Sequence, residues 1–236
     1  MRAAFVTGGS SGIGLAIARA LGHAGHALTI TSRRPERLEA AADELRAEGL
    51  TVHATAANLA DEEALAAAIA GHEQRYERLD VLVNNAGMGI SGEIDETPVK
   101  HLDLQLSVNL RAAVLGYHYA VPMLRRAGAE HRNALVVNTA SVTAQRPHPL
   151  MPIYATTKAA LVGLTRAMNV DLGAAGIKSC ALCPGIVATE MTADEAMRDD
   201  EKIAPADVAS AVVWLLSTSP SCVVPEIPFL RPGGVD

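Results

Sequence analysis

The chain has 236 residues, of which 49% are hydrophobic and 19% charged, and its formal net charge is −6. This balance can bury a sizeable core, which excludes an intrinsically disordered protein, and the length suits one large α/β domain over residues 1–236. The acidic balance, with no run of Lys or Arg longer than a pair, argues against nucleic acid as a partner.

The start of the chain and its apolar runs bear on location. The segment MRAAFV is too short for the core of a signal peptide, and no apolar run reaches the length of a membrane span. We therefore expect a protein of the cytoplasm that does not enter membranes.

Seven short apolar runs are typical of β-strands, and they lie at residues 3–7, 27–32, 51–55, 80–85, 134–139, 178–183 and 226–230. Helical patterns alternate with them: a first helix begins within residues 7–14, and others are expected at 35–49, 61–76, 103–126, 152–174 and 205–216. Strands that are apolar on both faces and alternate with helices predict an α/β fold with a parallel sheet covered on both sides.

Two of the three cysteines, Cys180 and Cys183, form a C-x-x-C spacing within the sixth expected strand. Residues i and i+3 of a strand point to opposite faces, so the two sulfur atoms should diverge. We interpret both as small buried hydrophobes and not as a disulfide or a metal pair. The eight histidines show no metal-ligand spacing, so we expect no metal site.

The first strand runs into TGGSSGIG at residues 7–14, where a helix begins. Glycines let the backbone turn sharply and approach a pyrophosphate, whose charge the helix N-terminus favours. The alternative is a tight strand–helix turn that binds nothing.

The second strand ends in Ser32, Arg33 and Arg34. In a dinucleotide site this position carries a carboxylate for NAD or a cation for the extra phosphate of NADP. The arginine pair favours NADP, with NAD as the alternative cofactor. Alternatively, the two arginines are an ordinary pair on a solvated surface loop and bind no ligand.

Further motifs follow in order: NNAG at 84–87, Asn109 in SVNL, Ser141, YATTK at 154–158 and PGIVAT at 184–189. Together with TGGSSGIG they resemble the short-chain dehydrogenase/reductase family, in its branch of shorter subunits. The resemblance implies a doubly wound sheet of seven strands, a nicotinamide cofactor, and assembly into a homotetramer or dimer. The chain departs from the family at Asn58, where an Asp is usual, at Ser11, where many NADP users carry a basic residue, and in a short stretch after Thr189.

Tyr154 and Lys158 lie one turn apart on the expected helix, so the ammonium can approach the phenol and lower its pKa. By resemblance, Tyr154 is the general acid/base, Lys158 also binds the ribose, Ser141 hydrogen-bonds the substrate oxygen and Asn109 holds a water that relays protons. Without the other motifs, the tyrosine and lysine would be a surface pair, Ser141 a turn cap and Asn109 a partner of backbone groups.

The resemblance also implies the residues that surround the ligands. The expected cofactor-binding residues are Gly8, Ser10, Ser11, Gly12, Ile13, Gly14, Ser32, Arg33, Arg34, Asn58, Leu59, Asn85, Ala86, Gly87, Tyr154, Lys158, Pro184, Gly185, Val187 and Thr189. Met151, Met191 and His148 are expected to border the substrate, although a histidine in a proline-rich loop can equally be inert. Residues 190–203 are expected to form a short, mobile substrate lid.

The leading hypothesis is an NADP(H)-dependent oxidoreductase that interconverts a carbonyl and a secondary alcohol of a small molecule. A non-catalytic dinucleotide sensor or scaffold would keep the fold without turnover. An isomerase or dehydratase would use the same tyrosine without net change of the cofactor.

Overall fold

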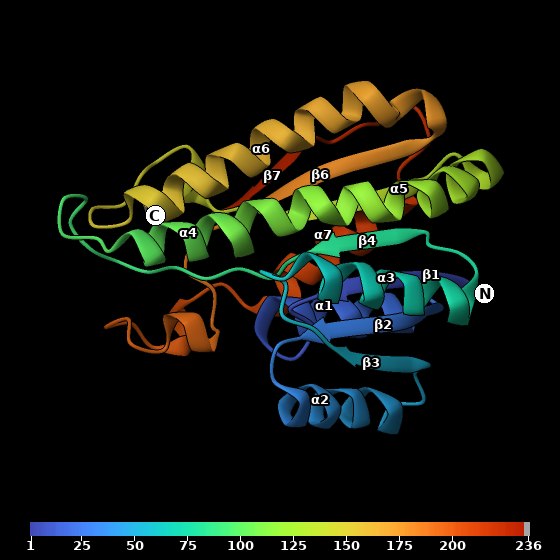
Figure 1. The fold of residues 1–236 in the computed structure, drawn as a ribbon, viewed down its shortest axis with the longest axis horizontal. Coiled ribbons are helices and arrows are strands. Elements are labelled where there is room, and N and C mark those ends of the chain that lie inside the picture. The colour runs from blue at the N-terminus through green and yellow to red at the C-terminus, as the bar shows by residue number, and fades with distance from the viewer. Residues whose placement is uncertain (234–236) are drawn as a thin grey trace.

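Seven parallel strands form one sheet, in the order β3-β2-β1-β4-β5-β6-β7, in the computed structural model, which describes residues 1–233 (Figure 1). The strands are β1 (Arg2–Thr7), β2 (His26–Ser32), β3 (Val52–Ala56), β4 (Val81–Asn84), β5 (Ala134–Thr139), β6 (Ile177–Pro184) and β7 (Glu226–Phe229). All seven expected strands are present, which confirms the predicted doubly wound α/β fold.

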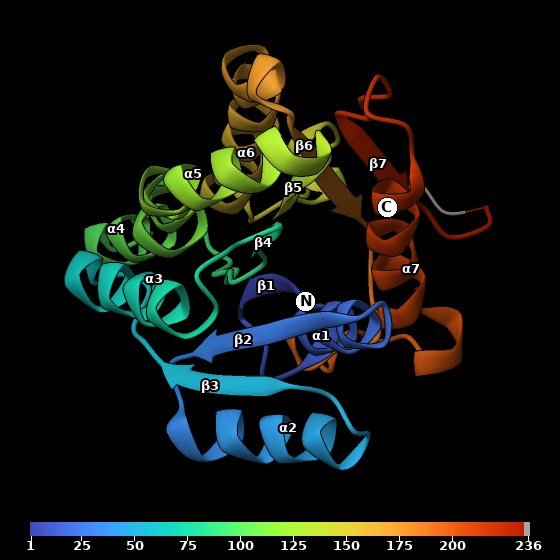
Figure 2. The same cartoon turned by 90° about the vertical axis from the view of Figure 1, so that its right-hand side faces the viewer.

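Within residues 1–233, seven α-helices connect the strands: α1 (Gly12–His23), α2 (Pro35–Ala47), α3 (Glu62–Tyr76), α4 (Val99–Leu106), α5 (Ala112–His131), α6 (Pro152–Leu172) and α7 (Pro205–Ser217). Figure 2 shows α3, α4, α5 and α6 on one side of the sheet and α1 and α7 on the other. The helix expected at 103–126 is longer and interrupted, because a π-helical turn, Ser107–Arg111, separates α4 from α5. A single extra residue in a helical turn does not alter the apolar period enough to be seen in the sequence.

Each face of the sheet has its own apolar core. On one face, Ile17 and Leu21 of α1 and Val212 of α7 pack with β-strand residues such as Val6 and Ile30. The other core includes the buried residues Phe5, Leu65, Leu82, Leu124 and Val136. This two-sided burial explains why the central strands are apolar at successive positions.

The two cysteines of the C-x-x-C spacing are buried in different apolar clusters, Cys180 in one with Leu182 and Val208 and Cys183 in another with Leu161 and Val162. Both thiols are free, and burial raises the pKa of each to about 12. They are therefore packing residues, as interpreted. Within residues 1–233 no cluster of His, Cys, Asp or Glu is placed to hold a metal, and no helix is long and apolar enough to cross a membrane.

His72 of α3 is fully buried against the sheet. Its Nε2 lies 2.9 Å from the carbonyl of Arg78, which can only accept, so Nε2 carries the proton. Nδ1 lies 2.8 Å from the Thr29 hydroxyl and accepts from it. A second proton would break this bond and bury a charge, and burial accordingly lowers the pKa of His72 to about 4.

We expect the free energy of unfolding to fall as the pH falls from about 6.5 to about 4, because the unfolded chain then binds a proton at His72 that the folded chain does not. The contribution is complete above about pH 6.5 and is at most about 3 kcal/mol. Urea unfolding over this range should show a shallower pH dependence in His72→Gln than in the parent or in the surface control His23→Gln. The same slope in all three proteins would refute the assignment.

Candidate active site

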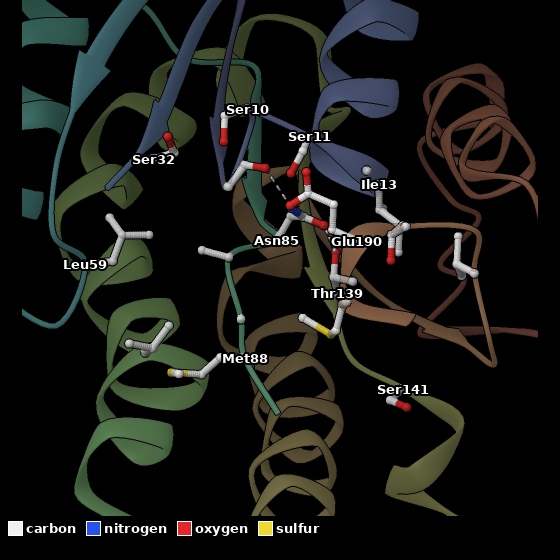
Figure 3. Close-up of a pocket in the computed structure, with 18 of the residues that line it drawn as sticks. Ser10, Ser11, Ile13, Ser32, Leu59, Asn85, Met88, Thr139, Ser141 and Glu190 are labelled. Atoms are coloured by element: carbon white, nitrogen blue, oxygen red, sulfur yellow. Dashed lines mark hydrogen bonds between the residues drawn. The ribbon is translucent and has the colours of Figure 1, made fainter. Parts of the chain in front are cut away.

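A cavity of about 440 Å³ opens at the carboxyl ends of the strands, the end at which ligands bind in open α/β sheets (Figure 3). The strand order reverses at the β1–β4 pair, and the loops after both strands line the cavity. In the view of Figure 3, Ser32 and Ser141 lie on opposite sides of the lining.

The predicted site residues that line this cavity are Gly8, Ser10, Ser11, Gly12, Ile13, Ser32, Arg33, Asn58, Leu59, Asn85, Ala86, Gly87, Ser141, Tyr154, Lys158, Pro184, Gly185, Val187, Thr189 and Met191. Gly14, Arg34, Asn109, His148 and Met151 are not among the lining residues. His148 is exposed and its Nδ1 lies 2.8 Å from the carbonyl of Pro149, so the structure gives it no place in the cavity.

The glycine-rich turn is built by close packing. Gly8 and Gly12 have φ of +67° and +53°, where side chains are strained. A Cβ on Gly14 would lie 2.2 Å from the carbonyl oxygen of Gly8, so this glycine lets α1 begin directly on the turn. Ser11 is the N-cap residue of α1 but its side chain makes no capping bond, which leaves backbone N–H groups of the first turn available to an anion.

Asn85 joins the ends of three strands. Its Nδ2 donates to the carbonyls of Thr7 and Gly8 at 3.2 and 3.3 Å, and its Oδ1 accepts from the Thr139 hydroxyl at 3.1 Å. Neighbouring Asn84 instead donates to Asn138 inside the core. The sequence motif therefore combines one residue that shapes the cavity with one that ties β4 to β5.

Ser141, Tyr154 and Lys158 meet at one end of the cavity. The Ser141 hydroxyl caps a short 3-10 turn by accepting from the N–H of Thr143 at 3.2 Å, and it also lines the cavity. The Lys158 ammonium donates to the carbonyl of Thr139 at 2.7 Å and lies 5.5 Å from the centroid of the Tyr154 ring. The arrangement brings a hydroxyl and a phenol to one wall, with an amine buried beside them.

The protein's own groups do not lower the pKa of Tyr154, contrary to our expectation. Burial raises the pKa of this phenol and outweighs an opposing hydrogen bond with Ser141. Burial also lowers the pKa of Lys158 to about 8. The spacing of the two residues predicted their proximity correctly, but it contained no information on burial, which dominates. At neutral pH the phenol is protonated and can donate a proton.

Asn109, in the π-helical turn, holds the backbone behind the cavity. Its Oδ1 accepts from the N–H of Met88 and its Nδ2 donates to the carbonyl of Met88, both at 2.8 Å. A second bond from Nδ2, of 3.1 Å, reaches the Thr157 hydroxyl on α6. The side chain thus joins the segment after NNAG to the helix of Tyr154, which is the backbone role that we had considered as the alternative.

Sequence reasoning missed several lining residues, namely Ala57, Met88, Leu104, Val108, Thr139 and Ala140. Leu104 and Val108 are one helical turn apart, and this spacing together with the nearby Asn109 could have identified them. Met88 directly follows NNAG, so its position in the chain was also informative. Glu190 and Thr192, which also line the cavity, belong to the expected lid segment 190–203.

The segment 190–203 is attached at both ends. Glu190 forms an ion pair with Arg37 through both of its carboxylate oxygens. Arg37 lies in the first turn of α2, far from the lid in the sequence. At the other end, the buried Lys202 ammonium donates to the carbonyl of Thr192 at 2.7 Å and lies 3.0 Å from Asp199. Ile203 pairs with Val187 in an isolated parallel bridge.

Comparisons with known proteins agree with this geometry. The model of the short chain dehydrogenase family matches residues 2–200. The chain is 37% identical over 195 residues to a 2-(R)-hydroxypropyl-CoM dehydrogenase of Xanthobacter autotrophicus, which covers 81% of this chain and 76% of the relative.

Two solved structures are similar over nearly the whole chain. One is a short-chain dehydrogenase from Burkholderia cenocepacia in complex with NADP, with a TM-score of 0.87, 31% identity and coverage of 96% of this chain and 95% of the other. The second is a 3-ketoacyl-(acyl-carrier-protein) reductase from Brucella melitensis complexed with NADH, with a TM-score of 0.89, 27% identity and coverage of 96% of both chains. Sequence motifs, sheet order and family match therefore agree: this chain is an oxidoreductase of the short-chain dehydrogenase family.

Proposed function

We propose that the protein interconverts a carbonyl and a secondary alcohol with NADP(H) as the hydride carrier. The observation that carries this proposal is the convergence of Ser141 and Tyr154 on the same cavity as the glycine-rich turn. A proton donor, a second hydrogen-bond donor and an anion-binding turn are the groups that this chemistry requires. The screen that tests it follows the absorbance of reduced nicotinamide with a panel of ketones.

The cavity suits a nicotinamide dinucleotide. The Ser32 side-chain oxygen is buried, lines the cavity and has no hydrogen-bond partner among residues 1–233, so it can bind a ribose or phosphate oxygen. The turn of residues 8–14 would hold the pyrophosphate, and Lys158 the ribose hydroxyls of the nicotinamide. When bound, the cofactor supplies or accepts the hydride.

In the direction of reduction, Tyr154 donates its phenolic proton to the carbonyl oxygen, and Ser141 donates a hydrogen bond to the same oxygen. The raised pKa of the buried Tyr154 favours the protonated phenol that this step needs. In the direction of oxidation, the phenol must lose its proton, which nearby positive charge favours. The Lys158 ammonium lies beside the phenol and can supply this charge. Asn109 holds the backbone of Met88 and bonds to Thr157, the residue before Lys158.

We predict that Arg33 selects NADP over NAD. Arg33 lines the cavity beside Ser32, where a ribose-binding carboxylate would otherwise repel the phosphate, and a guanidinium can grip the phosphate by paired hydrogen bonds. Such a contact is worth about 1.5 to 3 kcal/mol, or about ten- to hundredfold in affinity. The structural relatives include both an NADP and an NADH complex, so this choice needs its own experiment.

The experiment compares kcat/KM and dissociation constants of NADPH and NADH in the parent, in Arg33→Ala and in Arg34→Ala. Arg34 is the matched control, because it is adjacent in the chain but does not line the cavity. We expect only Arg33→Ala to lose the preference for NADPH over NADH. An equal loss with both cofactors, or a parent that prefers NADH, would contradict the prediction.

We also predict that residues 190–203 order over bound substrate as a lid. Their hydrogen exchange should slow in the ternary complex, because the segment rests on exposed ion pairs such as Arg37–Glu190 and little apolar burial. Arg37→Gln should exchange faster than the parent at 190–192 in the free protein. Full protection before any ligand is added would refute the lid.

Self-association as a tetramer or dimer and a cytoplasmic location also stay predictions.

A further inference from the structure

The part of the cavity beside Tyr154 has an apolar wall. Met88 is held through its backbone by Asn109, and Ala140 directly precedes Ser141. Leu104 and Val108 flank the same π-helical region, and Met191 follows the PGIVAT segment; all five line the cavity. Next to Met88, a Cβ on Gly89 would lie 3.6 Å from the Tyr154 ring, which places this segment against the phenol.

The cationic groups of the cavity are not available at this end. Among the described residues that line it, the cations are Arg33 and Lys158. Arg33 follows β2, on the side of Ser32, while the Lys158 ammonium is buried, donates to the carbonyl of Thr139 and is assigned to the ribose of the cofactor. The exposed Arg146 on the loop before α6 is outside the lining. A carboxylate or phosphate on a substrate would therefore lose water here without gaining a partner.

The hydroxyl of the lining residue Thr192, next to Met191 in the chain, is also occupied. The Thr192 hydroxyl hydrogen-bonds to the carbonyls of Val187 and Thr189. The hydroxyl groups of Ser141 and Tyr154 are both assigned to one oxygen atom of the substrate. The remainder of a substrate meets methionine, leucine, valine and alanine side chains.

Acidic residues are numerous in two segments that follow lining residues of this end. Glu93, Asp95 and Glu96 follow the segment that begins at Met88, and the segment after Met191 carries Asp194, Glu195, Asp199, Asp200 and Glu201. Both segments extend from the same end of the molecule (Figure 1). Arg198 pairs with Asp200 and Lys202 with Asp199, so these two acids are neutralised and Asp194, Glu195 and Glu201 give the second segment its net negative charge. Their combined field disfavours the entry of an anion.

We propose that the substrate is a neutral, largely apolar ketone or secondary alcohol, and that carbonyl compounds with a carboxylate or phosphate are rejected. This inference rests on the proposed oxidoreductase function and specifies its substrate class. The two lining methionines are flexible and polarizable, so the wall adapts to different alkyl groups. The site discriminates between substrates by their charge more strongly than by their shape.

A matched pair of ketones tests the proposal: 2-octanone and 7-oxooctanoate, which differ by a terminal carboxylate. With NADPH in excess, we expect kcat/KM to be at least about tenfold higher for 2-octanone. Met191→Lys places a cation in the wall and should narrow this ratio by about fivefold or more, whereas the neutral control Met191→Gln should not. An equal or higher kcat/KM for 7-oxooctanoate in the parent would overturn the proposal.

A binding measurement separates this proposal from the proposed function. N-Methylheptanamide and its analogue with a terminal carboxylate resemble the two ketones but do not accept hydride. Calorimetric titration of the NADPH-saturated protein should show tighter binding of the neutral amide. If the neutral amide binds more tightly while neither ketone is reduced, the preference of the site for neutral ligands stands and the proposed reduction of such ketones fails. Equal affinity for the two amides would overturn the substrate class.

Discussion

Tyr154→Phe is expected to lower kcat by at least about a hundredfold while the dissociation constant of NADPH changes by less than about threefold. The phenylalanine ring keeps the packing of the tyrosine ring, but it has no proton to exchange with the substrate oxygen. Stopped-flow reduction of a ketone and fluorescence titration of NADPH measure the two quantities separately.

Tyr119→Phe is the matched control, because the Tyr119 hydroxyl donates to Glu62 and lies outside the cavity lining. This variant should keep the kcat of the parent. Turnover by Tyr154→Phe within about threefold of the parent would rule out Tyr154 as the proton carrier.

Lys158→Ala is expected to weaken NADPH binding and kcat together, each by about tenfold or more. The substitution removes a proposed contact with the ribose and the ammonium beside the phenol. It also leaves the carbonyl of Thr139 without the 2.7 Å bond that it now accepts. Lys158→Met, which retains much of the side-chain volume, should show the same two losses with less effect on thermal stability.

Cofactor binding and turnover divide the roles of Lys158. Unchanged NADPH affinity in Lys158→Met would show that Lys158 does not bind the ribose. Unchanged kcat at saturating NADPH would show that Lys158 does not influence the proton transfer by Tyr154. Thermal unfolding of each variant shows whether a loss of activity comes from misfolding.

The sequence predicted the sheet well because its strands are short, apolar and separated by distinct helical patterns. It did not reveal the division of the helix at 103–126, since one π-helical turn leaves the apolar period of the sequence almost unchanged. Boundaries elsewhere differ by at most two residues, as at α2, which ends at Ala47 and not near Gly49.

The candidate site was predictable where a motif fixes the backbone and less so where burial or loop contacts decide. The glycine-rich turn and the Tyr154–Lys158 spacing led to cavity residues because both depend on local geometry. The direction of the Tyr154 pKa depends on the packing of distant elements, and the Glu190–Arg37 pair joins segments 153 residues apart. Neither the direction of this pKa shift nor this ion pair could be predicted from the residue types at the positions involved.

Transfer of deuteride from NADPH labelled at the nicotinamide carbon that donates hydride tests the central claim most directly. The parent protein is mixed with the labelled cofactor and 2-octanone, and the products are analysed by mass spectrometry. The proposed function predicts one deuterium in the product alcohol for each NADPH oxidised, and loss of this transfer in Tyr154→Phe. If no NADPH were oxidised with any ketone of the panel and no product carried deuterium, the proposed function would be contradicted.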